Sequence, residues 1–179
     1  MQKIFPNAIE FPKTKGFFGI GIENGQGTRN VGTIWRSAQI MGANFMFTIG
    51  GRYNRMKTDT MAGYRTIPMF EFDTLDEFYR ALPKESKLIG VELDERSVPI
   101  AEFKHPKRAV YLLGSEGLGL SQEAMALCHQ IVQLPGTHCM NVSVTGSLII
   151  YDRLMREGYK LENKTTDTNI IGEICRSTL

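Results

Sequence analysis

Short apolar runs alternate along the chain with segments in which apolar residues recur at helical spacing. Apolar runs of this length, bounded by polar residues or glycine, are typical of strands buried inside a sheet. The alternation of the two patterns predicts an α/β domain with a mainly parallel sheet. The predicted strands are Phe17–Ile22, Asn44–Ile49, Met69–Phe72, Lys87–Glu92, Ala109–Gly114 and Ile131–Leu134.

Four segments have the spacing of helices, and we expect them to cover both faces of the sheet. They are residues 30–42, 75–82, 122–128 and 141–155. In the first segment, Ile34, Ala38 and Met41 fall on one helix face. In the last, the apolar stripe consists of Val144, Leu148, Tyr151 and Met155.

The 179 residues are predicted to form one domain, large enough to bury about 70% of the unfolded surface. We place a lead segment at 1–16, the domain at 17–159 and a polar tail at 160–179. The chain has no internal repeat and no Gly/Ser linker, and we expect no separate binding module in either short flanking segment.

Composition and charge exclude several classes of protein. With 42% apolar and 22% charged residues, the chain is not disordered. The 21 Lys and Arg against 19 Asp and Glu give a net charge of +2, which argues against a histone-like binder of DNA but allows a local basic patch. Three cysteines and no long apolar stretch predict a reduced, cytoplasmic protein without a membrane partner.

Glycine-rich loops are the first candidate binding elements. Residues 25–30 lack the third glycine of a dinucleotide fingerprint, which disfavours an oxidoreductase, and the chain has no P-loop. Residues 114–121 follow a predicted strand and place Glu116 among three glycines. Such a loop lies at the carboxyl end of its strand, where α/β sheets bind ligands. The alternative is a plain turn whose Glu116 is solvated or caps the helix after Ser121.

Residues 134–143 form a Pro-Gly turn that leads into the last predicted helix. Asn141 and Ser143 stand where side chains cap exposed backbone N–H groups. The small residues at 143–147 indicate that another chain segment or a ligand lies close to this helix.

Two basic features are candidates for contacts with phosphate groups. Arg36 lies about 200° around its helix from Ile34, away from the apolar stripe, and Asn30 stands at the predicted N-cap. Residues 50–65 combine cations with two tyrosines, which suits phosphate contacts and base stacking. A surface arginine and a solvated loop are the alternatives. The cations of this segment are Arg52, Arg55, Lys57 and Arg65.

Metal binding is not expected. His129 lies beside Cys128 and His138 beside Cys139, but neither pair has the spacing of a zinc site. His105 precedes a proline and is predicted to be a solvated loop residue.

Taken together, three motifs resemble the SpoU (TrmH-like) branch of the SPOUT RNA methyltransferases. The pattern N-x-G-x-x-x-R is present as NVGTIWR at residues 30–36. The glycine loop with an embedded acid is similar to LLGSEGLGLS at 112–121, and the Pro turn with its Asn and Ser is similar to LPGTHCMNVS at 134–143. Order and spacing match from Phe17 to about Tyr159.

The resemblance implies a C-terminal trefoil knot, a homodimer, and S-adenosyl-L-methionine held between the second and third motifs. It implies methyl transfer to a ribose 2′-hydroxyl of structured RNA, with tRNA favoured over rRNA and without a metal. Wobble-position, D-loop and rRNA methylation are alternatives within the family. A knotted RNA-binding protein without turnover is the alternative outside it.

The resemblance also implies two sets of site residues. The catalytic and positioning residues are Asn30, Arg36, Glu116, Asn141 and Ser143. The donor pocket is formed by Val91, Gly114, Leu134, Cys139 and Met140. Arg36 would act on the ribose hydroxyl as a base or by binding the adjacent phosphate, and the second role is favoured because a guanidinium stays protonated. Cys139 stands where the family usually has serine.

Overall fold

The computed structural model describes residues 16–24, 28–51 and 67–157. Its strands are β1 (Phe17–Glu23), β2 (Phe45–Ile49), β3 (Met69–Phe72), β4 (Lys87–Val91), β5 (Val98–Pro99), β6 (Arg108–Leu113) and β7 (Gln130–Gln133). Its helices are α1 (Thr28–Ile40), α2 (Leu75–Ala81), α3 (Gln122–Leu127) and α4 (Val142–Arg156).

The strands form one seven-stranded sheet in the order β3-β2-β1-β6-β4-β7-β5, and every neighbouring pair is parallel. The predicted parallel α/β fold is therefore confirmed. The sequence did not predict β5, because two residues are too few to show a strand period. Since all strands run in one direction, their carboxyl ends meet at one edge of the sheet.

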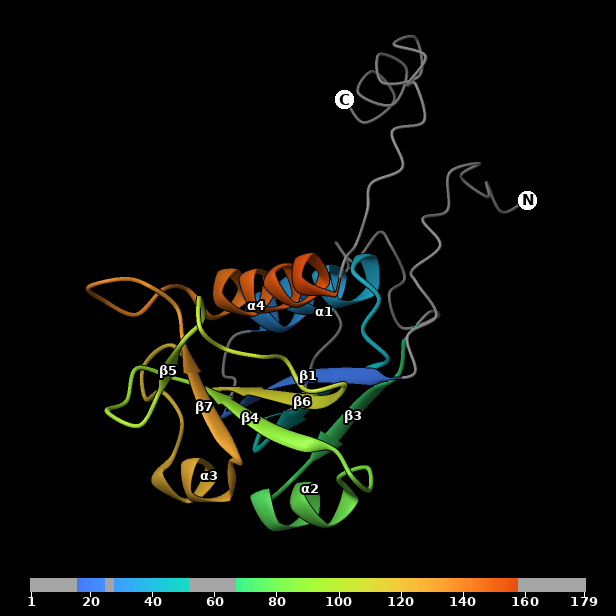
Figure 1. Cartoon of the computed structure of the whole chain (residues 1–179). Helices are drawn as coiled ribbons and strands as arrows, with labels where there is room; N and C mark the ends of the chain where they lie inside the picture. The colour runs from blue at the N-terminus through green and yellow to red at the C-terminus, as the bar shows by residue number, and fades with distance from the viewer. Residues whose placement is uncertain (1–15, 25–27, 52–66, 158–179) are drawn as a thin grey trace, which may run out of the picture.

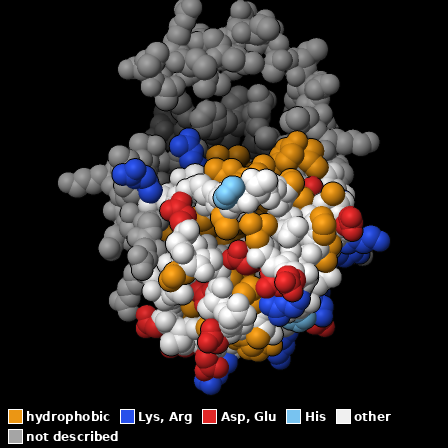
Figure 2. Space-filling model, turned by 90° about the vertical axis from the view of Figure 1, so that its left-hand side faces the viewer, with side chains coloured by type: hydrophobic (Ala, Val, Ile, Leu, Met, Phe, Trp, Pro, Cys, Tyr) orange, Lys and Arg blue, Asp and Glu red, His pale blue; other side chains and the backbone are white. Residues whose placement is uncertain are grey.

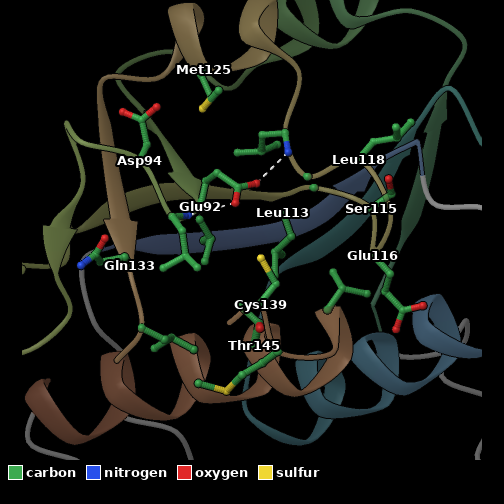
Figure 3. A pocket seen from close by; sticks show the side chains of 18 of the residues that line it. Glu92, Asp94, Leu113, Ser115, Glu116, Leu118, Met125, Gln133, Cys139 and Thr145 are labelled. Carbon is green, nitrogen blue, oxygen red and sulfur yellow. Dashed lines mark hydrogen bonds between the residues drawn. The ribbon is translucent and has the colours of Figure 1, made fainter. Parts of the chain in front are cut away.

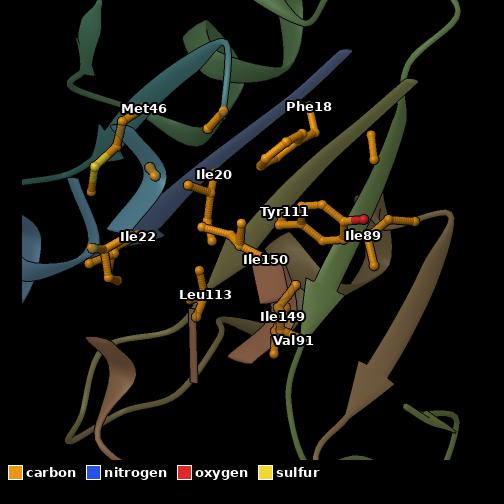
Figure 4. Packing of buried hydrophobic residues seen from close by; sticks show 14 of the residues in the cluster. Phe18, Ile20, Ile22, Met46, Ile89, Val91, Tyr111, Leu113, Ile149 and Ile150 are labelled. Atoms are coloured by element: carbon orange, nitrogen blue, oxygen red, sulfur yellow. The ribbon is translucent and has the colours of Figure 1, made fainter. Parts of the chain in front are cut away.

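Helices cover both faces of the sheet, as predicted: α1 and α4 lie on one face and α2 and α3 on the other (Figure 1). Alternate residues of each strand point to opposite layers. In β6, Tyr111 and Leu113 pack toward α1 and α4, whereas Val110 and Leu112 pack toward α2 and α3. Figure 4 shows the first layer, in which Ile149 of α4 lies among side chains of the sheet.

Close packing between α1 and α4 depends on small residues in α4. A Cβ atom on Gly146 would lie 3.3 Å from Ile34 and 3.4 Å from Ile20. The hydroxyl of Ser147 donates to the hydroxyl of Ser37 at 2.8 Å. The large neighbour that the small residues indicated is therefore α1 together with the underlying strand.

The apolar stripe of α4 does not face the sheet. Its members are between 39% and 55% exposed, and the buried face of the helix carries other residues. The exposed stripe consists of Val144, Leu148, Tyr151 and Met155. The helix therefore has a second apolar face that the rest of the described chain leaves uncovered.

The prediction that His105 is solvated is wrong. Its side chain is 2% exposed. One ring nitrogen lies 2.6 Å from the Tyr111 hydroxyl and the other 2.9 Å from Asp152 Oδ2. Arg153 donates to the same hydroxyl at 3.1 Å and to the Pro106 carbonyl at 2.7 Å. These groups tie α4 to the segment before β6, and burial lowers the pKa of His105.

The basic segment lies outside the described residues, so the role of Arg52, Arg55, Lys57 and Arg65 stays a prediction. The predicted domain boundaries fall in or beside such regions and also stay predictions. Within the described ranges, no helix is both long enough and apolar enough to cross a membrane.

Candidate functional site

A cavity of about 450 Å³ opens at the carboxyl edge of the sheet (Figure 3). This volume is within the range of small-molecule sites. Its walls come from the ends of β4, β6 and β7, from α3 and from the start of α4. They include residues 91–94, 113–120, 133–134, 138–140, Val142 and Thr145.

The five residues predicted to bind the methyl donor all line this cavity. They come from three separate stretches of the chain: Val91 from β4, Gly114 from the glycine loop, and Leu134, Cys139 and Met140 from the turn before α4. The structure therefore brings them together, although their role in binding a ligand stays a prediction.

The glycine loop after β6 folds back tightly on itself. Ser115 and Gly119 form an isolated bridge, and the Gly119 N–H donates to the Ser115 carbonyl at 2.9 Å. A Cβ atom on Gly114 would collide with the backbone of Gly119 and Leu120. Gly119 has a φ of +65°, a conformation that side chains disfavour. Gly117 has open space around it.

The three predicted motifs meet through one side chain, Asn141. Its Nδ2 donates to Asn30 Oδ1 at 3.2 Å and also to Glu116 Oε1. The alternative in which Glu116 caps α3 is wrong, because Ser121 is the N-cap of that helix. The prediction that Asn30 is an N-cap is also wrong, since α1 begins at Thr28.

The capping prediction for Asn141 is confirmed. Its Oδ1 accepts from the backbone N–H groups of Ser143 at 2.9 Å and Val144 at 3.4 Å. The hydroxyl of Ser143 donates to the same oxygen at 2.5 Å. The capping prediction for Ser143 is wrong, because Asn141 is the N-cap and the Ser143 hydroxyl donates to it. Ser143 is buried and does not line the cavity, so in this arrangement it contacts the site through Asn141.

Sequence reasoning missed two carboxylates that hold the glycine loop. Glu92, directly after β4, accepts from the Leu120 N–H at 2.8 Å. Glu23, at the end of β1 and only 4% exposed, accepts from the Ser121 N–H at 2.8 Å and from its hydroxyl at 2.6 Å. An acidic residue at the carboxyl end of a buried strand is the signal that could have identified both.

Arg36 is exposed on α1, as expected from its place on the helix, and does not line the cavity. No hydrogen bond or ion pair joins its side chain to another described residue. Of the predicted catalytic residues, the structure brings together Asn30, Glu116, Asn141 and Ser143, but within a single chain it does not bring Arg36 to them.

The two described cysteines differ in environment. Burial raises the pKa of Cys128 to about 12, with a smaller contribution from the charge of Glu23, and its thiol donates to the Ala124 carbonyl at 3.2 Å. Cys139 is exposed at the cavity. Among the described residues, no group of three His, Cys, Asp or Glu side chains could hold a metal ion.

Comparison with known proteins identifies related sequences. Residues 18–151 match the SpoU rRNA Methylase family. The tRNA (guanosine(18)-2'-O)-methyltransferase of Escherichia coli (strain K12) is 25% identical over 129 residues, which cover 69% of this chain and 56% of that protein. The mitochondrial rRNA methyltransferase 1 of Homo sapiens is 26% identical over 164 residues, covering 78% and 46%. The chain thus spans about half the length of these relatives.

A solved structure has the same fold. The AdoMet-bound rRNA methyltransferase from Sinorhizobium meliloti superposes with a TM-score of 0.71 and 19% identity, over 79% of this chain and 57% of that one. At this identity the likeness establishes a shared fold, which agrees with the parallel sheet described above.

Proposed function

The chain belongs to the SpoU rRNA methylase family, and on that premise we propose that it transfers a methyl group from S-adenosylmethionine to a ribose 2′-hydroxyl of structured RNA. The observation that carries the proposal is that the second and third motifs line one cavity, while Asn141 joins the glycine loop to Asn30 of the first motif. The favoured substrate is tRNA. An rRNA is the second candidate, because the curated relatives include methyltransferases of both kinds.

The cavity suits the methyl donor. Gly114 and Gly119 have no side chains, so the backbone of the loop can approach a ligand closely. Three carboxylates, Glu92, Asp94 and Glu116, line the cavity, on the face of the molecule that Figure 2 shows. A sulfonium donor is a cation, which carboxylates attract. When bound there, the donor supplies an electrophilic methyl group. Leu134 and Met140 would contact it from the turn before α4.

Arg36 is the residue proposed to act on the RNA. Its guanidinium stays protonated at neutral pH, so it binds a phosphate better than it removes a proton. By holding the phosphate next to the reactive ribose, Arg36 would align the 2′-hydroxyl with the methyl group. Its exposed position, away from the cavity of its own chain, supports action on the cavity of a second subunit.

The exposed stripe of α4 supports a homodimer. A row of four apolar side chains on one helix face is a surface that an identical helix can cover by two-fold symmetry. Close to it, the start of α4 carries Asn141 and Thr145, which belong to the site. A dimer formed through this stripe would bring the α1 helix of each subunit near the cavity of the other.

For the fold, we also propose that the C-terminal part of the chain is threaded through a loop to form a trefoil knot. The turn before α4 is bonded to the glycine loop through Asn141 and Glu116. Farther along α4, Arg153 donates to the carbonyls of Pro106 and Lys107, and Arg156 to that of Ile100. Contacts with two separate loops are what a helix in a trefoil knot would make. The cytoplasmic location stays a prediction.

The proposed function is tested by mass spectrometry of tRNA and rRNA nucleosides from a strain that lacks the protein. We expect one 2′-O-methylated nucleoside to disappear from tRNA and to return when the wild-type protein, but not Arg36→Ala, is supplied. Loss from rRNA alone would favour the second candidate. Unchanged nucleosides, together with RNA binding by the purified protein, would indicate a binding protein without turnover.

Mixing two inactive variants tests the role of Arg36 in the dimer. Co-expressed Arg36→Ala and Gly114→Val chains form mixed dimers in which one site has an intact cavity and, from the other subunit, an intact arginine. If Arg36 acts across the dimer, activity should return to about a quarter of the wild-type level, the share of intact sites under random pairing. If confirmed mixed dimers recover no activity, Arg36 acts on the cavity of its own chain.

A further inference from the structure

Glu92 joins the two facing walls of the cavity. We infer that it is a positioning residue for the methyl donor: its carboxylate fixes the glycine loop in the binding conformation and gives the cavity a preference for a cationic ligand. The inference rests on the proposed function, because it assumes that the ligand is a sulfonium donor.

The two oxygens of Glu92 accept from different walls. Oε1 accepts from the backbone N–H of Leu93 at 2.9 Å, and Oε2 accepts from that of Leu120 at 2.8 Å (Figure 3). Leu93 belongs to the wall after β4 and Leu120 to the glycine loop, and both line the cavity. Only a group with two acceptor oxygens can make both bonds, because a glutamine amide nitrogen would face an N–H group.

The shape of the glycine loop is matched to this carboxylate. A Cβ atom on Gly119 would lie 2.6 Å from Glu92 Oε2. Glu23 accepts from Ser121, the residue that follows Leu120. Two carboxylates from the ends of β4 and β1 thus hold two consecutive backbone N–H groups, which fixes the loop where it leads into α3.

The charge of Glu92 has no counter-charge among the described side chains. The neighbouring Asp94 is paired with Arg96 at 2.8 Å, whereas no described cation forms an ion pair with Glu92. A carboxylate held this way lowers the energy of a cation in the cavity more than that of a neutral ligand of the same shape. The sulfur of the methyl donor is a positively charged sulfonium, whereas the sulfur of the demethylated product is an uncharged thioether.

Glu92→Gln tests the inference against a control, Glu95→Gln. Glu95 is exposed in the same turn, does not line the cavity and carries the same charge. For Glu92→Gln we expect faster hydrogen exchange of the Leu120 amide in the ligand-free protein. Calorimetry should give an adenosylmethionine affinity about tenfold weaker, as expected for one lost charge-assisted hydrogen bond. The affinity for adenosylhomocysteine should fall less, and the KM for the donor should rise more than kcat falls.

The outcomes separate positioning from stability. If Glu92→Gln lowers the melting temperature but leaves both affinities and the Leu120 exchange like those of Glu95→Gln, the inference is overturned. Equal losses of affinity for adenosylmethionine and adenosylhomocysteine would contradict the inferred preference for a cationic ligand. If the wild type binds no adenosylmethionine, the proposed function fails, and the exchange of the Leu120 amide still decides whether Glu92 fixes the loop.

Discussion

Asn141 donates its side-chain amide to Asn30, 111 residues earlier in the chain, at 3.2 Å. The same amide donates to Glu116, while the amide oxygen caps α4. One side chain therefore both starts a helix and joins the three motifs. Because the two tasks use different atoms, a substitution can separate them.

Asn141→Asp keeps the capping oxygen and removes the amide donor. Aspartate caps a helix about as well as asparagine, so α4 should persist. The new carboxylate would face Glu116, and repulsion between like charges should move the two loops apart. We expect RNA methylation, measured with radiolabelled donor, to fall by more than about tenfold with little change in helical circular dichroism. Full activity would show that the contacts with Asn30 and Glu116 are dispensable.

Gly114→Ala should abolish donor binding. Its Cβ atom would collide with backbone atoms across the glycine loop, and backbone cannot move aside as a flexible side chain can. Gly117→Ala is the matched control, since a Cβ atom there meets nothing within 4 Å. Calorimetry with adenosylmethionine should detect binding by Gly117→Ala and none by Gly114→Ala. Similar affinities in both variants would mean that the loop does not form the donor site.

The cysteines should differ in reactivity toward a maleimide at pH 8. Cys139 is exposed at the cavity, whereas burial raises the pKa of Cys128 to about 12 and keeps that thiol protonated. Cys175 lies outside the described residues, so the experiment uses a Cys175→Ser background. Peptide mass spectrometry should find Cys139 labelled first, and adenosylmethionine should slow that labelling. If the labelling rate of Cys139 does not change when adenosylmethionine is added, Cys139 does not belong to the donor site.

Stability should fall as the pH drops below the ordinary histidine pKa of 6.5. Desolvation lowers the pKa of His105 in the folded protein, so the unfolded chain takes up a proton first. The stabilising effect is complete above pH 6.5 and is lost as the pH falls through the lowered folded value. In the neutral form, His105 donates to Asp152 and accepts from the Tyr111 hydroxyl, an assignment inferred from the network. Protonation would remove that acceptor from a buried hydroxyl.

Urea unfolding at pH 7.5 and 5.5 measures this effect. The slope should not exceed about 1.4 kcal/mol per pH unit, the limit for uptake of one proton. Asp152, Arg153 and Arg156 are the charged groups that face the ring. Burial alone would raise the pKa of Asp152, but its hydrogen bonds with Arg156 and His105 lower it, so Asp152 does not account for a slope between these two pH values. His105→Gln should flatten the profile between these two pH values. A wild-type profile that is already flat would contradict the assignment.

The contrast between the two faces of α4 shows where sequence reasoning was incomplete. The spacing of Val144, Leu148 and Tyr151 identified the helix correctly. However, Ile149 and Ile150 on the adjacent face are the buried residues. Because this helix has apolar residues on two faces, its sequence pattern does not show which face is buried. Packing against α1 and the sheet decides this.

The sequence by itself determined the strands other than β5, the four helices and the glycine loop, because hydrophobic periods and turn residues act over a few neighbouring positions. Only the tertiary structure decided that Glu92 and Glu23 hold that loop and that His105 is buried beside Asp152. These contacts join residues far apart in the chain. Their geometry follows from the strand order and from the packing of α4, and no local pattern encodes either of these.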